Sequence, residues 1–224
     1  PAFVVFENLA LAEQPDLVYG TAYAQFDATK VDRGCTVREF GACSVTTCPP
    51  ETEALDAADA DAGIMTVSGT SPVLPESDDV DDGYQLYADG ALFGNGDVPT
   101  ASFSGARVPA FSESVPAPWR AVEHSPPLST LTTLPRSGLA LTWKLEGDGA
   151  GVSLFALDPT VVDPDDDVPY ERMSCSVPAS DGVLVIPPEA MTALSGRGTF
   201  LLFAGTACGK EVEVGEWNVN VQAN

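Results

Sequence analysis

An alternation of apolar and polar residues with a period of two is the feature that most constrains the fold of this chain. In the segment that ends at Glu146, the apolar side chains of Leu139, Leu141, Trp143 and Leu145 would all point to the same side. This pattern predicts a strand with one face buried and the other in water, which is typical of antiparallel sheets. Trp143 lies on the apolar side and is therefore predicted to be a core residue.

Similar segments recur along the chain, whereas helical periodicity is nearly absent. We predict further strands over residues 3–6, 17–26, 64–68, 152–157, 172–177, 183–186, 199–203, 211–214 and 217–221. In the second of these, Tyr19, Ala22, Ala24 and Phe26 are expected in the core. One short helical turn is predicted over 187–194, because Pro and Glu favour a helix start.

Two turn sequences predict hairpins. Asp89-Gly90 lies between apolar flanks within 84–93, which is a strong hairpin signal. The Gly-rich segment 147–151 is expected to join the strand that ends at Glu146 to the one over 152–157, in a hairpin or a meander.

Many short strands separated by Gly, Pro and Asp turns predict an all-β fold, an antiparallel β-sandwich of two packed β domains. We expect an N-terminal β-rich domain over 1–108, a Pro-rich connection over 109–127 and a second β-sandwich over 128–224. The 44% of hydrophobic residues is enough to build such cores.

The second half of the chain resembles the Ig-like β-sandwich modules of secreted proteins and lipoproteins of GC-rich bacteria. The segments that carry the resemblance are 134–137, 141–143, Cys175, 182–187 and 199–203. The resemblance implies an Ig-like fold for the C-terminal domain and a surface location, and it implies no activity.

The five cysteines match no zinc-binding spacing, and disulfides in an oxidising compartment fit them better. Cys175 and Cys208 both fall in predicted strands and are expected to pair with each other. A second bridge is expected between Cys35 and Cys48. Cys43 is then left over, either as a buried thiol or as the partner of a cysteine in another molecule. We therefore expect a secreted or cell-surface protein.

A formal charge of −23, from 33 acidic and 10 basic residues, argues against nucleic acids and anionic membranes as partners. No segment is apolar over the length that a membrane helix needs, so no direct membrane insertion is expected. The acidic residues gather in loops, where carboxylates either face water or bind a hard cation such as Ca²⁺. The candidate calcium ligands are Asp163, Asp165 and Asp167 in one loop and Asp78, Asp79 and Asp81 in another.

The sequence predicts no catalytic residues. His124, the one histidine, lies in the Pro-rich connection, and no serine stands in a Gly-x-Ser-x-Gly motif. Among the aromatic residues, Trp119 and Tyr87 are candidates for stacking on a ligand, with core packing as the alternative for each.

We therefore expect a non-enzymatic structural or interaction protein that binds a protein partner or assembles with itself. Its apolar terminal segments could add a strand to a neighbouring sheet, or pair within their own sheets. The alternative function is a calcium-assisted carbohydrate-binding module.

Overall fold

The computed structural model describes residues 2–11, 14–26, 34–49, 60–78, 83–131, 133–146, 154–162, 170–194 and 199–224. The fold is all-β, as predicted, and consists of antiparallel sheets packed in layers, with a single short α-helix in the part of the chain described. The chain divides into two compact units. Unit 1 comprises residues 1–30, 56–118 and 207–224, and unit 2 comprises residues 31–55 and 119–206.

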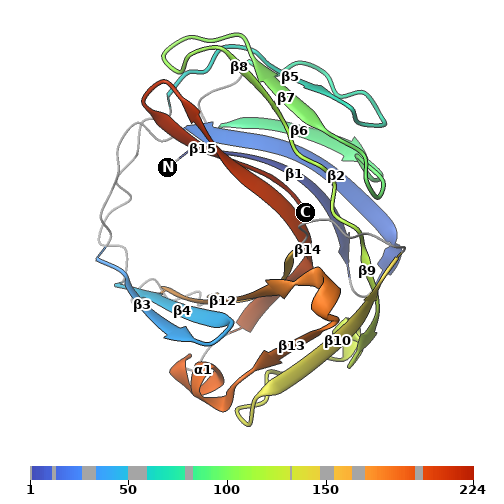
Figure 1. Cartoon of the computed structure of the whole chain (residues 1–224), viewed down its shortest axis with the longest axis vertical. Helices are drawn as coiled ribbons and strands as arrows, with labels where there is room; N and C mark the ends of the chain where they lie inside the picture. The colour runs from blue at the N-terminus through green and yellow to red at the C-terminus, as the bar shows by residue number, and fades with distance from the viewer. Residues whose placement is uncertain are drawn as a thin grey trace. The chain divides into compact units, whose positions relative to one another are not determined.

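Unit 1 contains two sheets that pack against each other (Figure 1). The first has the order β14-β15-β1-β2-β6 within this unit, and the second has the order β5-β7-β8. Their strands are β1 (Ala2–Leu11), β2 (Gln14–Phe26), β5 (Met65–Ser68), β6 (Tyr84–Asp89), β7 (Thr100–Phe103), β8 (Phe111–Ser114), β14 (Thr199–Val214) and β15 (Trp217–Ala223). Of β14, residues 207–214 belong to this unit and residues 199–206 to unit 2.

Alternation decides which side chains fill the core of unit 1. In β15, Val219, Val221 and Ala223 are buried, and the residues between them are less so. The ring of Phe26 makes edge contacts with other aromatic rings of this core, at centroid distances of 5.2 Å to Phe103 and 6.2 Å to Trp217. Such edge-to-face contacts add to the stabilisation that burial itself provides.

The terminal strands β1 and β15 pair with each other in parallel, from Ala2 opposite Val219 to Phe6 opposite Ala223. On their other sides, β1 pairs with β2, and β15 pairs with β14. The terminal strands therefore pair within their own sheet, which was one of the two expected alternatives.

Unit 2 also contains two sheets, with the orders β3-β4-β12-β11 and β13-β10-β9. The strands are β3 (Thr36–Phe40), β4 (Cys43–Cys48), β9 (Ala121–Ser125), β10 (Leu139–Leu145), β11 (Leu154–Val162), β12 (Tyr170–Pro178) and β13 (Val183–Ile186). Short 3-10 turns over Leu128–Thr130 and Ala179–Asp181 and the helix α1 (Pro188–Ala193) complete the unit.

The core of unit 2 contains the predicted core residue Trp143. Leu139, Leu141 and Trp143 on β10 are buried, and the indole Nε1 of Trp143 donates a hydrogen bond to the carbonyl oxygen of Ala179 at 2.9 Å. This bond satisfies the polar atom of a buried tryptophan. The prediction that Trp143 is a core residue is confirmed.

The units do not follow the boundaries expected from the sequence, 1–108, 109–127 and 128–224. The hairpin of β3 and β4, expected in the N-terminal domain, contributes Cys43 and Val45 to the core of unit 2. The C-terminal strand β15 belongs to unit 1. Both units are assembled from segments that are far apart in the sequence, so contiguous boundaries cannot describe them.

The expected pairing of strands across these two turns is absent from the described part of the chain, and residues 147–151 themselves lie outside it. β10 pairs with β13 and β9, while β11 pairs with β12. After Asp89 no strand returns along β6, because Leu92 and Phe93 are buried in the core of unit 1 instead. The side chain of Asn8 holds this segment, accepting a hydrogen bond from the backbone N–H of Leu92 at 2.7 Å and donating one to the carbonyl oxygen of Phe93 at 2.9 Å.

Candidate ligand-binding face

The first sheet of unit 1 has one face in the core and a second face that carries aromatic and amide side chains. Val4, Ala22, Leu86 and Val221 are buried in the core of unit 1. Because successive side chains of a strand point to opposite faces, the residues next to them in sequence point to the second face. We call this second face the amide–aromatic face. It is defined by the aromatic residues Phe3, Tyr19, Tyr23 and Tyr87, the amides Gln25, Gln85, Asn220 and Gln222, and Thr21.

The four aromatic residues form a stripe across three strands. The rings of Phe3 and Tyr23 meet edge to face, with centroids 5.7 Å apart. Tyr87 lies opposite Thr21, so Tyr19 and Tyr23 are both its diagonal neighbours. Diagonal neighbours on one face of an antiparallel pair are about 7–8 Å apart, within reach of aromatic side chains.

One end of this stripe is open to water. The side chain of Tyr87 is 68% exposed and that of Tyr19 is 43% exposed. The hydroxyl group of Tyr87 donates a hydrogen bond to Oε1 of Gln85 on the same strand, which holds the ring along β6. Contiguous patches of exposed apolar side chains often mark interaction sites, whereas single exposed ones are common.

Carboxylates lie on the amide–aromatic face, and no described position of it carries Lys or Arg. Glu7 lies opposite Thr21, and Glu211 lies opposite Asn220. Burial raises the pKa of Glu7, an effect that a hydrogen bond with the Asn224 side chain partly offsets. The face is therefore neutral to negative in charge, and it presents amide groups that can both donate and accept hydrogen bonds.

Only one residue of this face, Tyr87, was predicted from the sequence to be a ligand-stacking candidate. Tyr19 was expected in the core, and this prediction was wrong, because Tyr19 has the opposite parity to Ala22, Ala24 and Phe26 along β2. The parity of the strand could have revealed Tyr19 and Tyr23. Phe3 could not have been found in this way without knowing that β1 pairs with β2.

Trp119, the second stacking candidate, belongs to unit 2, whereas Tyr87 belongs to unit 1. It lies just before β9 and is half-buried. Its role in binding stays a prediction.

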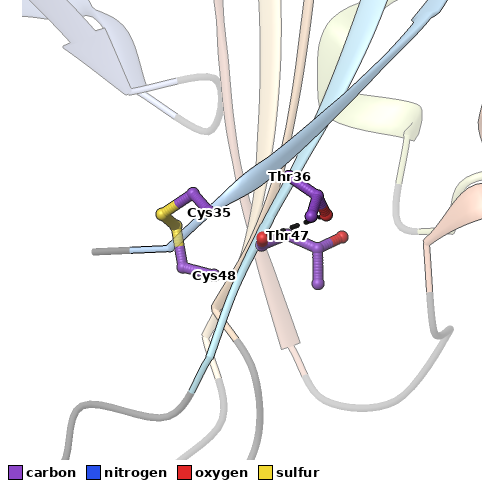
Figure 2. Close-up of a disulfide and its surroundings, with 4 residues drawn as sticks. All are labelled: Cys35, Thr36, Thr47 and Cys48. Carbon is purple, nitrogen blue, oxygen red and sulfur yellow. Dashed lines mark hydrogen bonds between the residues drawn. A yellow bond between two sulfur atoms is a disulfide. The ribbon is translucent and has the colours of Figure 1, made fainter. Parts of the chain in front are cut away.

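The disulfides differ in part from the expected ones. Cys35 is bonded to Cys48 as expected, and this bond closes the hairpin of β3 and β4 (Figure 2). Beside it, the hydroxyl group of Thr36 donates a hydrogen bond to the carbonyl oxygen of Thr47 at 3.4 Å.

The expected bond between Cys175 and Cys208 was wrong. Cys175 is bonded to Cys43, which lies directly opposite it in the pairing of β4 with β12. Cys43 is therefore not a thiol for an intermolecular bond, and it is only 1% exposed. Cys208 takes part in neither disulfide and is buried in the core of unit 1.

Most candidate calcium ligands lie outside the described residues, namely Asp79, Asp81, Asp163, Asp165 and Asp167. Asp78 is described and is exposed. Within the described ranges, no three His, Cys, Asp or Glu side chains are grouped so as to hold a metal ion. Calcium binding stays a prediction.

His124 lies on β9, and burial lowers the pKa of its imidazole. The ring is therefore neutral at pH 7. The neighbouring residue Glu123 has a positive φ of 52° and forms an ion pair with Lys144 across a bulge between β9 and β10. This arrangement indicates a local structural role for the segment.

No family model, no curated protein and no solved structure matches this chain. The resemblance to Ig-like modules therefore stays a prediction. In the described part of the chain, no helix has the length and apolar character needed to cross a membrane.

Proposed function

We propose that this chain is a non-enzymatic interaction protein of the cell surface or the extracellular space, and that it binds its partner through the amide–aromatic face. The observation that carries the proposal is the exposure of Tyr87 and Tyr19 on one face of a regular sheet. Tyrosine is common at binding surfaces because its ring provides contact area and its hydroxyl group provides a hydrogen bond.

The regular sheet supports this proposal because it holds the contact residues rigidly. Both strands that carry the exposed tyrosines are paired over several residues, from Gly20 opposite Ala88 to Ala24 opposite Tyr84. A rigid aromatic surface loses little conformational entropy on binding.

Two disulfides support the extracellular location. Such bonds persist in oxidising compartments and are rare in the cytosol, where thiols are kept reduced.

The test is binding of the purified, oxidised protein to the isolated cell envelope of the organism that produces it. We expect saturable binding that falls at least tenfold in Tyr87→Ala combined with Tyr19→Ala. Val73→Ala is the matched control, since Val73 is 85% exposed and lies outside the amide–aromatic face.

Equal binding by the double variant and the control would contradict the proposed face. Detection of the protein only in the cytosol, with its cysteines reduced, would contradict the proposed location.

A further inference from the structure

The two disulfides of unit 2 differ in their exposure to solvent. Cys43 and Cys175 are 1% and 0% exposed and lie in the core of this unit. Cys35 is exposed, and its partner Cys48 is half-buried. Thiol–disulfide exchange begins when a thiolate reaches one of the two sulfur atoms, and exposed disulfides are the labile or regulatory ones. The two bonds should therefore differ in their reaction with a reductant.

We propose that the bond between Cys35 and Cys48 is a site of reversible thiol–disulfide exchange with a protein dithiol of the thioredoxin class. The reductant opens this bond in the folded protein, while the bond between Cys43 and Cys175 stays closed. The site belongs to unit 2, whereas the amide–aromatic face belongs to unit 1, so the proposal does not depend on that face.

The strand next to this bond is accessible along its edge. β3 stands at the end of the strand order of its sheet, and residues 36–39 are all exposed. In the described part of the chain, β4 alone pairs with β3. The bond lies just before Thr36, at the open end of the hairpin (Figure 2). A protein dithiol can therefore reach a sulfur atom here, whereas the bond in the core is shielded.

Other interactions hold the hairpin when this bond is open. All five residues of β3 pair with β4, and β4 pairs with β12 along its whole length. Val45 on β4 is buried in the core of unit 2, and the bond from Cys43 to Cys175 fixes β4 to β12. Reduction of the exposed bond is therefore expected to leave the fold intact.

Two successive exchange steps reduce the bond. In the first, a thiolate of the reductant attacks one sulfur atom of the bond between Cys35 and Cys48, which forms a mixed disulfide and releases the other sulfur as a thiolate. In the second, the remaining thiolate of the reductant attacks the mixed disulfide, and the reductant leaves with an internal disulfide. Two electrons pass to the protein, and the two cysteines take up one proton each from water. The same steps in reverse close the bond.

The experiment exposes the full, oxidised chain under native conditions to two probes, dithiothreitol and reduced thioredoxin. At intervals the reaction is stopped with acid, the protein is unfolded, all thiols are alkylated, and peptide mass mapping locates the label. We expect label on Cys35 and Cys48 to appear about tenfold faster than label on Cys43 and Cys175. The number of thiols per chain should pause at three, since Cys208 lies outside both disulfides.

The matched variant is Cys35→Ser combined with Cys48→Ser. It should release no new thiol over the time in which the wild-type protein releases two. Oxidised glutathione, added after the reductant is removed, should return the wild-type protein to one thiol per chain. The selectively reduced wild-type protein, with its thiols blocked, should keep a cooperative thermal transition, which would not be seen if the fold depended on this bond.

Release of all four bonded cysteines at one rate would overturn the proposal, because it would show that reduction proceeds through unfolding. Loss of the cooperative transition in the selectively reduced protein would overturn it as well. Reaction with dithiothreitol but not with thioredoxin would overturn the assignment to a protein dithiol, and resistance of the bond to both probes would overturn the site itself.

Discussion

Single polar side chains in this molecule fix the conformation of loop segments that the apolar–polar alternation of the strands does not predict. Tyr84 is the clearest case. It is 1% exposed, and its hydroxyl group accepts a hydrogen bond from the backbone N–H of Ala62 at 2.9 Å and donates one to Oδ1 of Asp61 at 3.3 Å. The same Asp61 oxygen accepts a hydrogen bond from the N–H of Gly63 at 2.7 Å. The carboxylate of Asp61 therefore shapes a turn.

We predict that Tyr84→Phe lowers the free energy of unfolding by about 1–3 kcal/mol, because a buried N–H group loses its acceptor. Burial is the main cause that raises the pKa of Tyr84 to about 12. The folded form thus holds its proton more tightly than the unfolded form, whose pKa is about 10. This contribution to stability is fully present below pH 10 and is lost as the pH rises toward 12.

Urea unfolding at about pH 8 and about pH 11 measures both effects. The wild-type protein is expected to lose more stability than Tyr84→Phe between these two pH values. An identical pH dependence of the two proteins would show that Tyr84 ionises as freely in the fold as in the unfolded chain.

At the scale of elements, a disulfide attaches the hairpin of β3 and β4 to unit 2. Cys43 on β4 and Cys175 on β12 are 132 residues apart in the sequence. The guanidinium group of Arg38 on β3 supports the same attachment, donating a hydrogen bond to the carbonyl oxygen of Ala193 in α1 at 3.3 Å. It also lies over the ring of Phe40 on its own strand, 5.6 Å from the centroid.

We predict that replacing Cys43 and Cys175 by Ala destabilises the protein more than replacing Cys35 and Cys48 by Ser. The disulfide between Cys35 and Cys48 joins residues that are only 13 positions apart in the sequence. Disulfides stabilise mainly by restricting the unfolded chain, by about 3 kcal/mol for a loop of ~15 residues and about 4.7 kcal/mol for ~100 residues. Thermal melts of the two double variants provide the comparison, and an equal loss in both would contradict it.

The two disulfides predict which cysteine can react with a thiol reagent. Without reductant, the native protein should not react with a thiol reagent, because Cys208 is buried. After denaturation without reduction, one thiol per chain should react, and peptide mapping should place the label on Cys208. Label on Cys43 would instead support the pairing expected from the sequence.

At the scale of the whole molecule, the excess of acidic over basic residues opposes folding by self-repulsion. The chain has 33 acidic and 10 basic residues, and among the latter Lys210 forms an ion pair, with its Nζ 2.6 Å from Glu113 Oε2. An exposed pair of this kind stabilises a protein by at most about 1 kcal/mol. Salt screens the remaining repulsion because the Debye length falls from about 10 Å at 0.1 M to about 3 Å at 1 M.

We predict that sodium chloride raises the melting temperature at pH 7 as its concentration increases from about 0.1 M to about 1 M. The increase should be smaller at about pH 4, where many carboxyl groups are protonated. Calorimetry at both pH values is the measurement. The same increase at both would show that salt acts by a route other than the screening of carboxylates.

Much of the fold follows from alternation along single strands, which is a local property. The period of two predicted the all-β class, the burial of Trp143 and most strands, because successive side chains of any strand point to opposite faces. The turn of helix at Pro188–Ala193 also followed from local signals. Tyr87 was predicted as a ligand-stacking residue from its type alone.

The partners of those strands depend on contacts between distant segments, and no local pattern encodes them. The tertiary structure alone placed Cys43 opposite Cys175, joined β1 to β15, and put β4 in the core of unit 2. It also aligned Phe3, Tyr23, Tyr87 and Tyr19 on one face, since each belongs to a strand whose register is set by its neighbour. A side chain's direction can be predicted from its own strand, whereas its neighbours are decided by how the strands pair.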